Sequence, residues 1–306
     1  MKRFRNLDDL EHERSIQGVL RWQLERAQQK RLIGTPASVV DNDGSLLKGA
    51  PKASLTWLGH ASWLVQIAQT SVMIDPVLFA RIALTVQRHA GPGLTLAQLP
   101  TIDAVLITHN HMDHMDAPSV MALAKQCPWA TFVVPEGLRP WFVRHGIERS
   151  VELPWWSSTK VGGVKIQAVP SQHWSRRGLL DEDRTHWCGY VIEGDGRRVY
   201  HTGDTAYFTG FSQIAARVGA IDAAMLPIGA YEPRWFMRSQ HMNPDDAVRA
   251  FEDLRATRFV AMHWGTFMLT DEPLDEPPKA LARAWKSHGI TQANPEIPAI
   301  GETLWL

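Results

Sequence analysis

The spacing of hydrophobic positions changes along the chain. Over residues 15–31 apolar side chains recur at helical spacing, which predicts a packing helix: Ile16, Val19, Leu20 and Leu24. A passage rich in Gly, Pro and Asp follows up to residue 51 and predicts a loop. From Ser54 onward the apolar runs have the length of strands. The runs "SLTWLGHASWLVQI" and "SVMIDP" together predict a β-meander.

The remaining chain alternates strand-like runs with helix-like segments. The strand-like runs are "DAVLITH", "TFVVP", "VKIQAVPSQH", "YVIEGDGRRVYHTGD", "AAMLPIG" and "RFVAMHW". Residues 118–126 have a helical pattern, and residues 194–196 read Gly-Asp-Gly, which predicts a hairpin turn. Asn243, followed by Pro244 and two acids, predicts the start of another helix. This alternation indicates an α/β fold.

Length and composition narrow the classes of protein that fit. A chain of 306 residues that is 44% hydrophobic buries a large core, and we expect one domain over 1–306, with the helix and loop of 1–50 packed on it. The 32 basic and 32 acidic residues cancel, so no general charge attracts nucleic acid. Two cysteines, a charged N-terminus and the lack of a long apolar run predict a cytoplasmic protein without a membrane-spanning helix.

A cluster of metal-binding residue types follows one buried run directly. In "THNHMDHMD" the side chains of His109, His111, Asp113 and His114 come after the strand-like residues 104–108. Imidazole nitrogens and carboxylate oxygens are ligands that suit zinc and similar divalent ions. The sequence therefore predicts a metal site at the end of this strand.

Three more candidate ligands stand at the ends of other strand-like runs. They are His173, Asp204 and His263. Because strand ends on one side of a sheet converge, we expect all seven residues to meet. Seven ligands exceed one tetrahedral site and suffice for two metals that share one carboxylate and leave a position for water.

These residues carry a resemblance to a known family. The motifs "TWLGHAS", "THNHMDHMD", "SQHWSRRGLLDEDRTHW", "HTGDTAY", "LPIGAYEPRWFMRSQHMNPDDAV" and "HWGTFMLTDEP", with "RFRN" and "LRWQLER" near the start, resemble the N-acyl-phosphatidylethanolamine-hydrolysing phospholipase D family of the metallo-β-lactamase fold superfamily. The resemblance covers nearly the whole chain. It implies a metallo-β-lactamase-like four-layer αββα sandwich.

The resemblance also implies roles for the candidate residues. One zinc ion would be held by His109, His111 and His173. The other would be held by Asp113, His114 and His263, with Asp204 bridging the two. The family's active-site histidine falls on His241, so the catalytic residues would be His241, Asp113 and Asp204. Two Zn²⁺ are the expected cofactors, with iron or manganese as alternatives.

The function that follows is a dinuclear zinc-dependent phosphodiesterase. By the resemblance it hydrolyses N-acyl-phosphatidylethanolamine to N-acylethanolamine and phosphatidic acid, with a metal-bridging hydroxide as nucleophile. The alternatives are a metal-dependent hydrolase of a soluble phosphodiester or lactone, and a metal-binding sensor without turnover. The partner would be a phospholipid and no nucleic acid, and the oligomeric state stays open, with a homodimer among the options.

Some residues allow two interpretations. Asp116 either orients a ligand histidine or caps the following helix, and His60 either lines the cavity or is held in a turn by backbone. Gln240 would assist orientation of the substrate, whereas His201 has a structural role. Residues 76–99 form a buried helix or, with Trp174 and "SRRGLL", line an apolar entrance that contacts a membrane surface.

Overall fold

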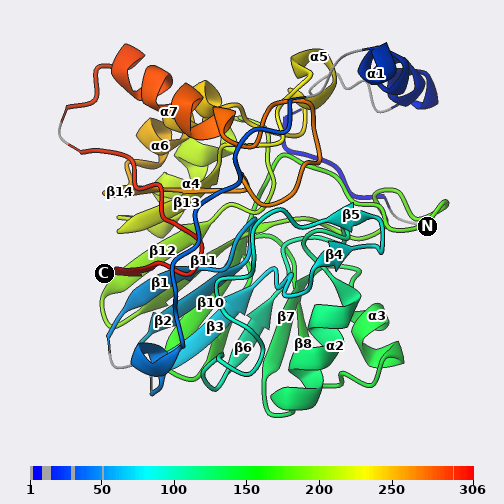
Figure 1. Ribbon diagram of the computed structural model, residues 1–306. Coiled ribbons are helices and arrows are strands. Elements are labelled where there is room, and N and C mark those ends of the chain that lie inside the picture. The colour runs from blue at the N-terminus through cyan, green and yellow to red at the C-terminus, as the bar shows by residue number, and fades with distance from the viewer. Residues whose placement is uncertain (1–2, 9–14, 29–31, 50–51, 292) are drawn as a thin grey trace.

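The computed structural model describes residues 3–8, 15–28, 32–49, 52–291 and 293–306 (Figure 1). Among these residues, seven strands form one sheet in the order β15-β1-β2-β3-β6-β7-β8. Its strands are β1 Ser54–Trp57, β2 Trp63–Ile67, β3 Thr70–Ile74, β6 Ala104–Leu106, β7 Thr131–Pro135, β8 Ser150–Leu153 and β15 Thr303–Trp305. Strands β1, β2 and β3 pair antiparallel in sequence order, so the predicted meander is confirmed.

A second sheet faces the first. Its order among the described residues is β14-β13-β12-β11-β10-β9. Its strands are β9 Ser158–Val161, β10 Val164–Val169, β11 Gly189–Gly194, β12 Arg197–His201, β13 Ala223–Pro227 and β14 Arg258–Met262. Strands β6 and β13 are buried along their whole length, which explains why each is a continuous apolar run in the sequence instead of an alternation.

Helices cover the outer face of each sheet. Helices α2 Ala117–Gln126 and α3 Arg139–Arg144 pack on the first sheet through one apolar cluster. A second cluster joins the other sheet to α4 Gly210–Val218, α6 Pro244–Leu254 and α7 Glu276–Ser287. A third, which includes Trp57, Trp63 and Tyr190, fills the space between the sheets. The predicted four-layer αββα sandwich is confirmed.

Two local predictions are confirmed in detail. Asp195 and Gly196 both have positive φ and join β11 to β12 as a two-residue turn, the geometry that favours this pair in hairpins. Helix α6 begins after Asn243, whose side chain accepts from the Asp246 N–H while the Asp246 carboxylate accepts from the Asn243 N–H. This reciprocal cap satisfies two backbone donors that the first helical turn leaves free.

The N-terminal helix α1, Ile16–Gln28, differs from the prediction in what it buries. It contacts the rest of the chain mainly through polar and aromatic side chains: Trp22 stacks on Phe236, Arg26 pairs with Asp271, and Glu25 accepts from the Trp235 indole. Leu20 and two further apolar residues of the predicted packing stripe, Val19 and Leu24, are exposed. In the described residues, no helix has both the length and the apolar character to cross a membrane.

The segment over residues 76–99 is not a helix. It contains a small hairpin of β4 Arg81–Ile82 and β5 Val86–Gln87 within otherwise irregular chain. Leu78 is buried in the core beneath the first sheet, whereas Leu84 at the hairpin turn is 84% exposed. The prediction of a buried helix is therefore wrong. The segment divides its apolar residues between core and surface.

Strand direction brings distant parts of the sequence to one edge of the sandwich. Strand β3 runs parallel to β6, and β12 runs parallel to both β13 and β14. Strand β10 has the same direction as β12, because both pair antiparallel with β11. The carboxyl ends of these strands therefore open onto a common edge, where the predicted ligands follow them. Two short helices, η1 Ser45–Leu47 and α5 Arg234–Met237, lie in connections.

Candidate active site

The loop after β6 carries four of the seven predicted ligands between two fixed ends. At its start, Thr108 donates its N–H to Asp75 Oδ1 at 2.8 Å. At its end, Asp116 accepts from the N–H and hydroxyl of Ser119 and caps α2. Of its two predicted roles, Asp116 therefore has that of capping the following helix. A turn at His111, whose carbonyl accepts from the Met115 N–H at 2.8 Å, closes the loop.

Three imidazoles meet in the first group of ligands. His111 Nδ1 lies 2.8 Å from His109 Nε2 and 3.2 Å from His173 Nε2. The other ring nitrogens are committed elsewhere. His109 Nδ1 is 3.0 Å from the Thr108 hydroxyl, which itself donates to Asp75, and His173 Nδ1 is 2.9 Å from the Gln240 carbonyl. Both Nε2 atoms therefore present lone pairs to His111.

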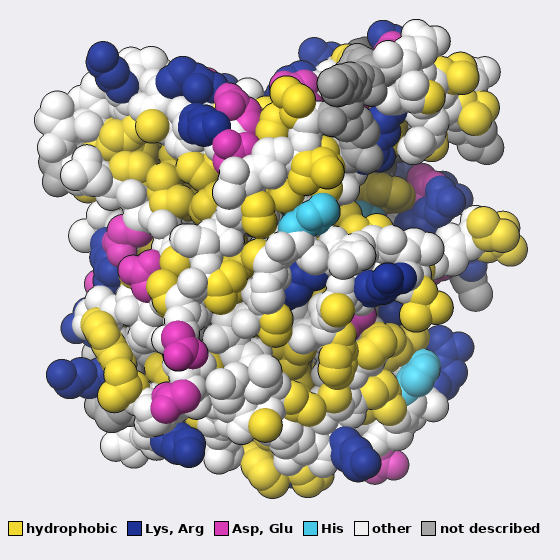
Figure 2. Space-filling view, in the orientation of Figure 1, with side chains coloured by type: hydrophobic (Ala, Val, Ile, Leu, Met, Phe, Trp, Pro, Cys, Tyr) yellow, Lys and Arg dark blue, Asp and Glu magenta, His cyan; other side chains and the backbone are white. Residues whose placement is uncertain are grey.

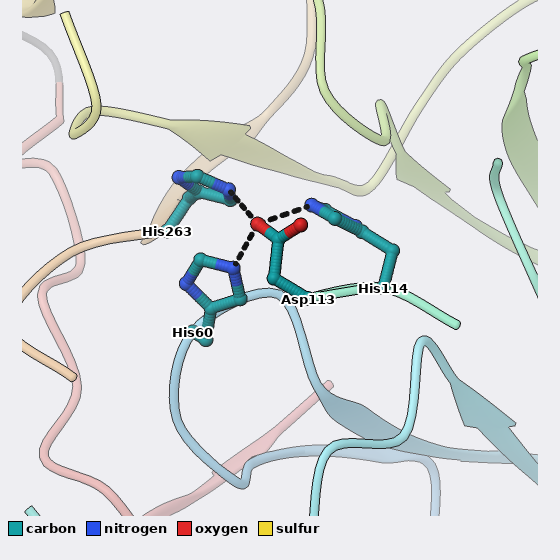
Figure 3. A group of neighbouring side chains, drawn as sticks. All are labelled: His60, Asp113, His114 and His263. Carbon is teal, nitrogen blue, oxygen red and sulfur yellow. Dashed lines mark hydrogen bonds and ion pairs between the residues drawn. The ribbon is translucent and has the colours of Figure 1, made fainter. Parts of the chain in front are cut away.

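The second group surrounds the Asp113 carboxylate (Figure 3). Asp113 Oδ2 lies 3.0 Å from His60 Nε2, 3.6 Å from His114 Nε2 and 3.9 Å from His263 Nε2. His60 and His263 come from loops after β1 and β14, far apart in sequence. All three histidines are buried. The group thus has one carboxylate enclosed by imidazoles, in contrast to the first group.

Asp204 lies between the two groups. Its Oδ1 is 3.0 Å from His263 Nε2, and its Oδ2 is 3.1 Å from His114 Nε2. Oδ2 is also 3.9 Å from His173 Nε2, in the first group. The carboxylate is nearly fully buried. The structure thus brings all seven predicted ligands to one edge of the sandwich, with Asp204 at their centre.

Several buried nitrogens of the site have no hydrogen-bond partner among the described residues. They are His111 Nε2 and His263 Nδ1 among the candidate ligands, and Nδ1 of the neighbouring His241. A buried polar atom without a partner costs on the order of 1–3 kcal/mol. Lone pairs that converge without enough protons between them repel one another. A cation at this place removes both costs, so the donor set fits a metal centre.

The imidazoles of the first group favour the neutral form that a metal needs. Burial lowers the pKa of His109 and of His173 well below the ordinary histidine value, and lowers the pKa of His111 to about 4. A neutral imidazole keeps a lone pair free for coordination. These three side chains are therefore ready to bind a cation without first losing a proton near neutral pH.

His114 behaves in the opposite way. Burial opposes its positive charge, but the carboxylates of Asp204, Asp113 and Asp75 outweigh burial and raise its pKa well above the ordinary value. The attraction acts in return on Asp113 and Asp204, whose pKa values are lowered although burial alone would raise them. In the second group, therefore, a proton on His114 balances charge that a bound cation would otherwise balance.

Asp75 is a functional residue that sequence reasoning missed. Its Oδ2 accepts from the Thr108 hydroxyl at 2.6 Å and from His114 Nδ1 at 2.7 Å. It fixes the tautomer and direction of His114 and, through Thr108, of His109. Such outer partners orient metal ligands. The signal was present, because Asp75 stands at the end of β3 on the same edge as the ligands.

His60 combines both of its predicted roles. It has a φ of 56° in a turn, where its carbonyl accepts from the Trp57 indole and from the His263 N–H. Its ring nevertheless points into the second group and contacts Asp113. Burial is the main cause that lowers the pKa of His60 to about 3. The turn thus holds a neutral imidazole against a ligand carboxylate.

His241 borders the site from the loop between α5 and α6. Its Nδ1 is 3.8 Å from Asp204 Oδ2, and burial lowers the pKa of the imidazole to about 4. The side chain of Gln240 turns away and donates to the Phe236 carbonyl. The Gln240 backbone carbonyl accepts from His173 Nδ1 and so orients that imidazole, whereas the role of the Gln240 side chain toward substrate stays a prediction. His201 bonds the Ala61 carbonyl and faces away from the ligands.

Comparisons with known proteins agree with this geometry. A family model described as a beta-lactamase superfamily domain matches residues 70–264. An N-acyl-phosphatidylethanolamine-hydrolyzing phospholipase D of Caenorhabditis elegans is 38% identical over 237 residues, which cover 72% of this chain and 67% of that protein. A UPF0173 metal-dependent hydrolase of Pelotomaculum thermopropionicum is 30% identical over 257 residues, which cover 82% of this chain and 99% of that protein.

A solved structure has the same fold. The metallo hydrolase Igni18 of the archaeon Ignicoccus hospitalis superposes with a TM-score of 0.62 at 24% identity, over 83% of this chain and 97% of that one. At this identity the similarity concerns the fold alone. The sequence relatives decide the family. The chain belongs to the metallo-β-lactamase superfamily of metal-dependent hydrolases, in the family of the N-acyl-phosphatidylethanolamine-hydrolysing phospholipases D.

Proposed function

We propose that this protein is a dinuclear zinc-dependent phosphodiesterase that hydrolyses N-acyl-phosphatidylethanolamine to N-acylethanolamine and phosphatidic acid. One observation carries the metal-dependent part of the proposal. The Nε2 atoms of His109 and His173 both lie within 3.2 Å of His111 Nδ1, and neither Nε2 atom carries a proton to share. The substrate is inferred from the name of the relative in Caenorhabditis elegans.

The donor sets support two ions. The three imidazoles of the first group would hold one, and Asp113, His114 and His263 would hold the other. Asp204 reaches both groups and is the natural bridge between them. Mixed nitrogen and oxygen donors without cysteine suit zinc in an open, catalytic site, and iron or manganese accept the same donors.

Bound divalent ions supply a water-derived nucleophile near neutral pH and polarise phosphoryl oxygens. The reaction forms a bond from the water oxygen to phosphorus and breaks the bond from phosphorus to the ethanolamine oxygen. Asp113 and Asp204 fix the ligand geometry through the contacts described above. His241 Nδ1, which has no hydrogen-bond partner among the residues described, is free to hydrogen-bond the substrate. Because the pKa of this imidazole is about 4, the proton that the departing alkoxide needs comes from water.

We also propose that the rim of the site touches a lipid surface. The loop over residues 174–182 lies beside the ligands, because the Trp174 ring contacts His111 and Arg177 donates to the Asn110 and Met115 carbonyls. At its tip Leu179 is 88% exposed and the adjoining Leu180 83%. Figure 2 shows hydrophobic side chains projecting from the right-hand edge of the molecule, with basic side chains beside them. Exposed leucines between Arg176 on one side and Asp181 on the other favour shallow, reversible contact with a membrane surface.

An isotope experiment tests the reaction. The zinc-loaded protein is incubated in ¹⁸O-water with vesicles that contain N-acyl-phosphatidylethanolamine and other phospholipids, and the products are identified by mass spectrometry. We expect one ¹⁸O atom in phosphatidic acid and none in N-acylethanolamine, because attack occurs at phosphorus. Label in the N-acylethanolamine would exclude this bond cleavage.

A soluble substrate distinguishes the alternative. The similarity to a metal-dependent hydrolase, which covers 82% of this chain and 99% of that protein, makes a soluble phosphodiester or lactone the alternative substrate. Bis(p-nitrophenyl) phosphate and a panel of lactones are therefore assayed beside the vesicles. Fast turnover of a soluble substrate with no lipid hydrolysis would support the alternative, and metal binding with no turnover of any substrate would support a sensor.

A further inference from the structure

The N-terminal strap, residues 3–8, lies outside the segment that matches the superfamily model but contacts the metal centre. It contains "RFRN", one of the motifs that resemble the family. Its outer end is held at Phe4, whose N–H donates to the Asp183 carbonyl at 2.8 Å and whose ring stacks on His186 at 4.4 Å. From there the strap runs across the loop that carries His173.

Asn6 binds the backbone of His173 from both sides. Its Nδ2 donates to the His173 carbonyl at 2.8 Å, and its Oδ1 accepts from the His173 N–H at 3.1 Å. Oδ1 also accepts from the buried Trp187 indole at 2.8 Å. Only a carboxamide offers a donor and an acceptor at the required separation. The side chain therefore pairs with this one residue as a neighbouring strand would.

The next part of the strap joins two ligand-bearing segments. Gln172 donates its side-chain amide to the Asp8 carbonyl at 2.8 Å, and Thr209 donates its N–H and hydroxyl to the Asp8 carboxylate at 2.9 and 2.7 Å. Gln172 also bonds directly to the segment after Asp204, through the Thr205 hydroxyl and the Ala206 N–H. The loop of His173 and the segment of Asp204 are thereby tied together from outside.

We propose that Asn6 is a positioning residue of the metal centre, acting on the ligand His173. The imidazole of His173 is fixed at two places: its Nδ1 by the Gln240 carbonyl and its backbone by Asn6. With both fixed, Nε2 has one direction, toward His111. Loss of the Asn6 bonds frees the backbone to rotate and leaves the buried His173 N–H without its partner. This inference rests on the proposed metal centre.

Metal titration of Asn6→Ala tests the inference. The metal-free protein is titrated with Co²⁺ against a competing chelator, and the Co²⁺ absorption bands report the ligand geometry. We expect one of two equivalents to bind about 10- to 100-fold more weakly, with altered bands, because an outer partner of a ligand has been lost. The second equivalent, which does not use His173, should keep its affinity.

Asn42→Ala is the matched control. Asn42 is also partly buried, and its carboxamide likewise donates to one backbone carbonyl, that of Gly301 at 2.7 Å, and accepts from one N–H, that of Gly44 at 2.9 Å. None of these residues belongs to a ligand loop. Equal loss of Co²⁺ affinity in both variants would mean that Asn6 only stabilises the fold, and this result would overturn the proposal.

Asn6→Asp covers the case in which the alanine variant does not fold. The carboxylate retains the acceptor for the His173 N–H but turns a second acceptor toward the His173 carbonyl in place of the donor, so loss of the same equivalent is again expected. Unchanged affinity and bands in Asn6→Asp and in folded Asn6→Ala would refute the proposal. If the wild-type protein itself bound no Co²⁺ or Zn²⁺, the proposed function would fail first, and the two failures are therefore distinguishable.

Discussion

The two ligand groups hold their positions by different physical means. The first consists of three imidazoles made neutral by burial and directed by the Thr108 hydroxyl and a backbone carbonyl. The second places His114 among the carboxylates of Asp75, Asp113 and Asp204, which raise its pKa well above the ordinary value when no cation is bound. The first group thus depends on geometry and the second on charge.

This difference predicts how each group fails. A geometric site loses affinity when a bracing contact is removed, whereas a charged site loses affinity when a carboxylate is neutralised. In the second group the attraction between carboxylates and a divalent ion is strong because burial weakens screening by water. Two kinds of substitution distinguish a geometric site from a charged one. The first kind changes the charge of a side chain but not its size, and the second removes a contact without changing charge.

Asp204→Asn should have the largest effect, because this carboxylate belongs to both groups. We expect both metal equivalents to be lost and turnover to fall at least about 1,000-fold, or about 4 kcal/mol in activation free energy. Metal content and lipid hydrolysis are measured on the same samples. His201→Ala is the control and should lower thermal stability more than turnover. Near-normal activity in Asp204→Asn would contradict the role of Asp204 as a ligand that both groups share.

Asp75→Asn should come next. It keeps the shape but weakens the acceptor for His114 Nδ1 and for the Thr108 hydroxyl. Outer partners of this kind contribute about 10- to 100-fold in metal affinity or activity. Zn²⁺ affinity by chelator competition, with turnover at saturating zinc, gives the measurement. An effect as large as that of Asp204→Asn would mean that Asp75 acts as more than an orienting residue.

Acid should destabilise the metal-free protein. Burial lowers the pKa of His60 to about 3 and of His111 to about 4. Between about pH 6.5 and about pH 4, therefore, these histidines bind protons in the unfolded chain but not in the native state. Their contribution to the free energy of unfolding is fully present above about pH 6.5 and is lost as the pH falls toward about 4. His114, whose pKa is raised, contributes with the opposite sign.

The neutral histidines outnumber His114, so the net free energy of unfolding should fall from about pH 7 to about pH 5, by on the order of 1 kcal/mol for each such histidine. Urea denaturation of chelator-treated protein at several pH values provides the measurement. Asp113 and Asp204 do not oppose this trend, because their lowered pKa values lie below the window. A rise in stability on acidification would show that the charged group dominates.

The smallest effect on folding is expected at the rim. Serine at both Leu179 and Leu180 should change the free energy of unfolding by less than about 0.5 kcal/mol, because both side chains are exposed. Vesicle binding and lipid hydrolysis should fall several-fold, while hydrolysis of a soluble phosphodiester stays constant. Leu78→Ser is the contrast. Its side chain is core, so a loss of about 2–5 kcal/mol is expected. Equal loss on both substrates in the rim variant would contradict the membrane contact.

The sequence predicted which seven side chains would meet, because His109, His173 and His263 follow apolar runs that are easy to recognise as strands. His263, for example, follows "RFVAM" directly. The role of Asp75 was not predicted, since an aspartate before a proline is equally typical of a plain strand end. The exposed side of α1 and the division of residues 76–99 between core and surface were not predicted either, because spacing indicates an apolar face but not what covers it. The single domain over 1–306, the cytoplasmic location and the homodimer stay predictions.

Strand β15 has a consequence for biosynthesis. It pairs with β1, and the hydroxyls of Thr56 and Thr303 meet across 247 positions of sequence. At about 5–20 residues per second, a ribosome needs on the order of tens of seconds to make the chain between them. Throughout that time the open edge of β1 is free to pair with another nascent chain. A chaperone that shields this edge would therefore matter more for yield than for the stability of the finished protein.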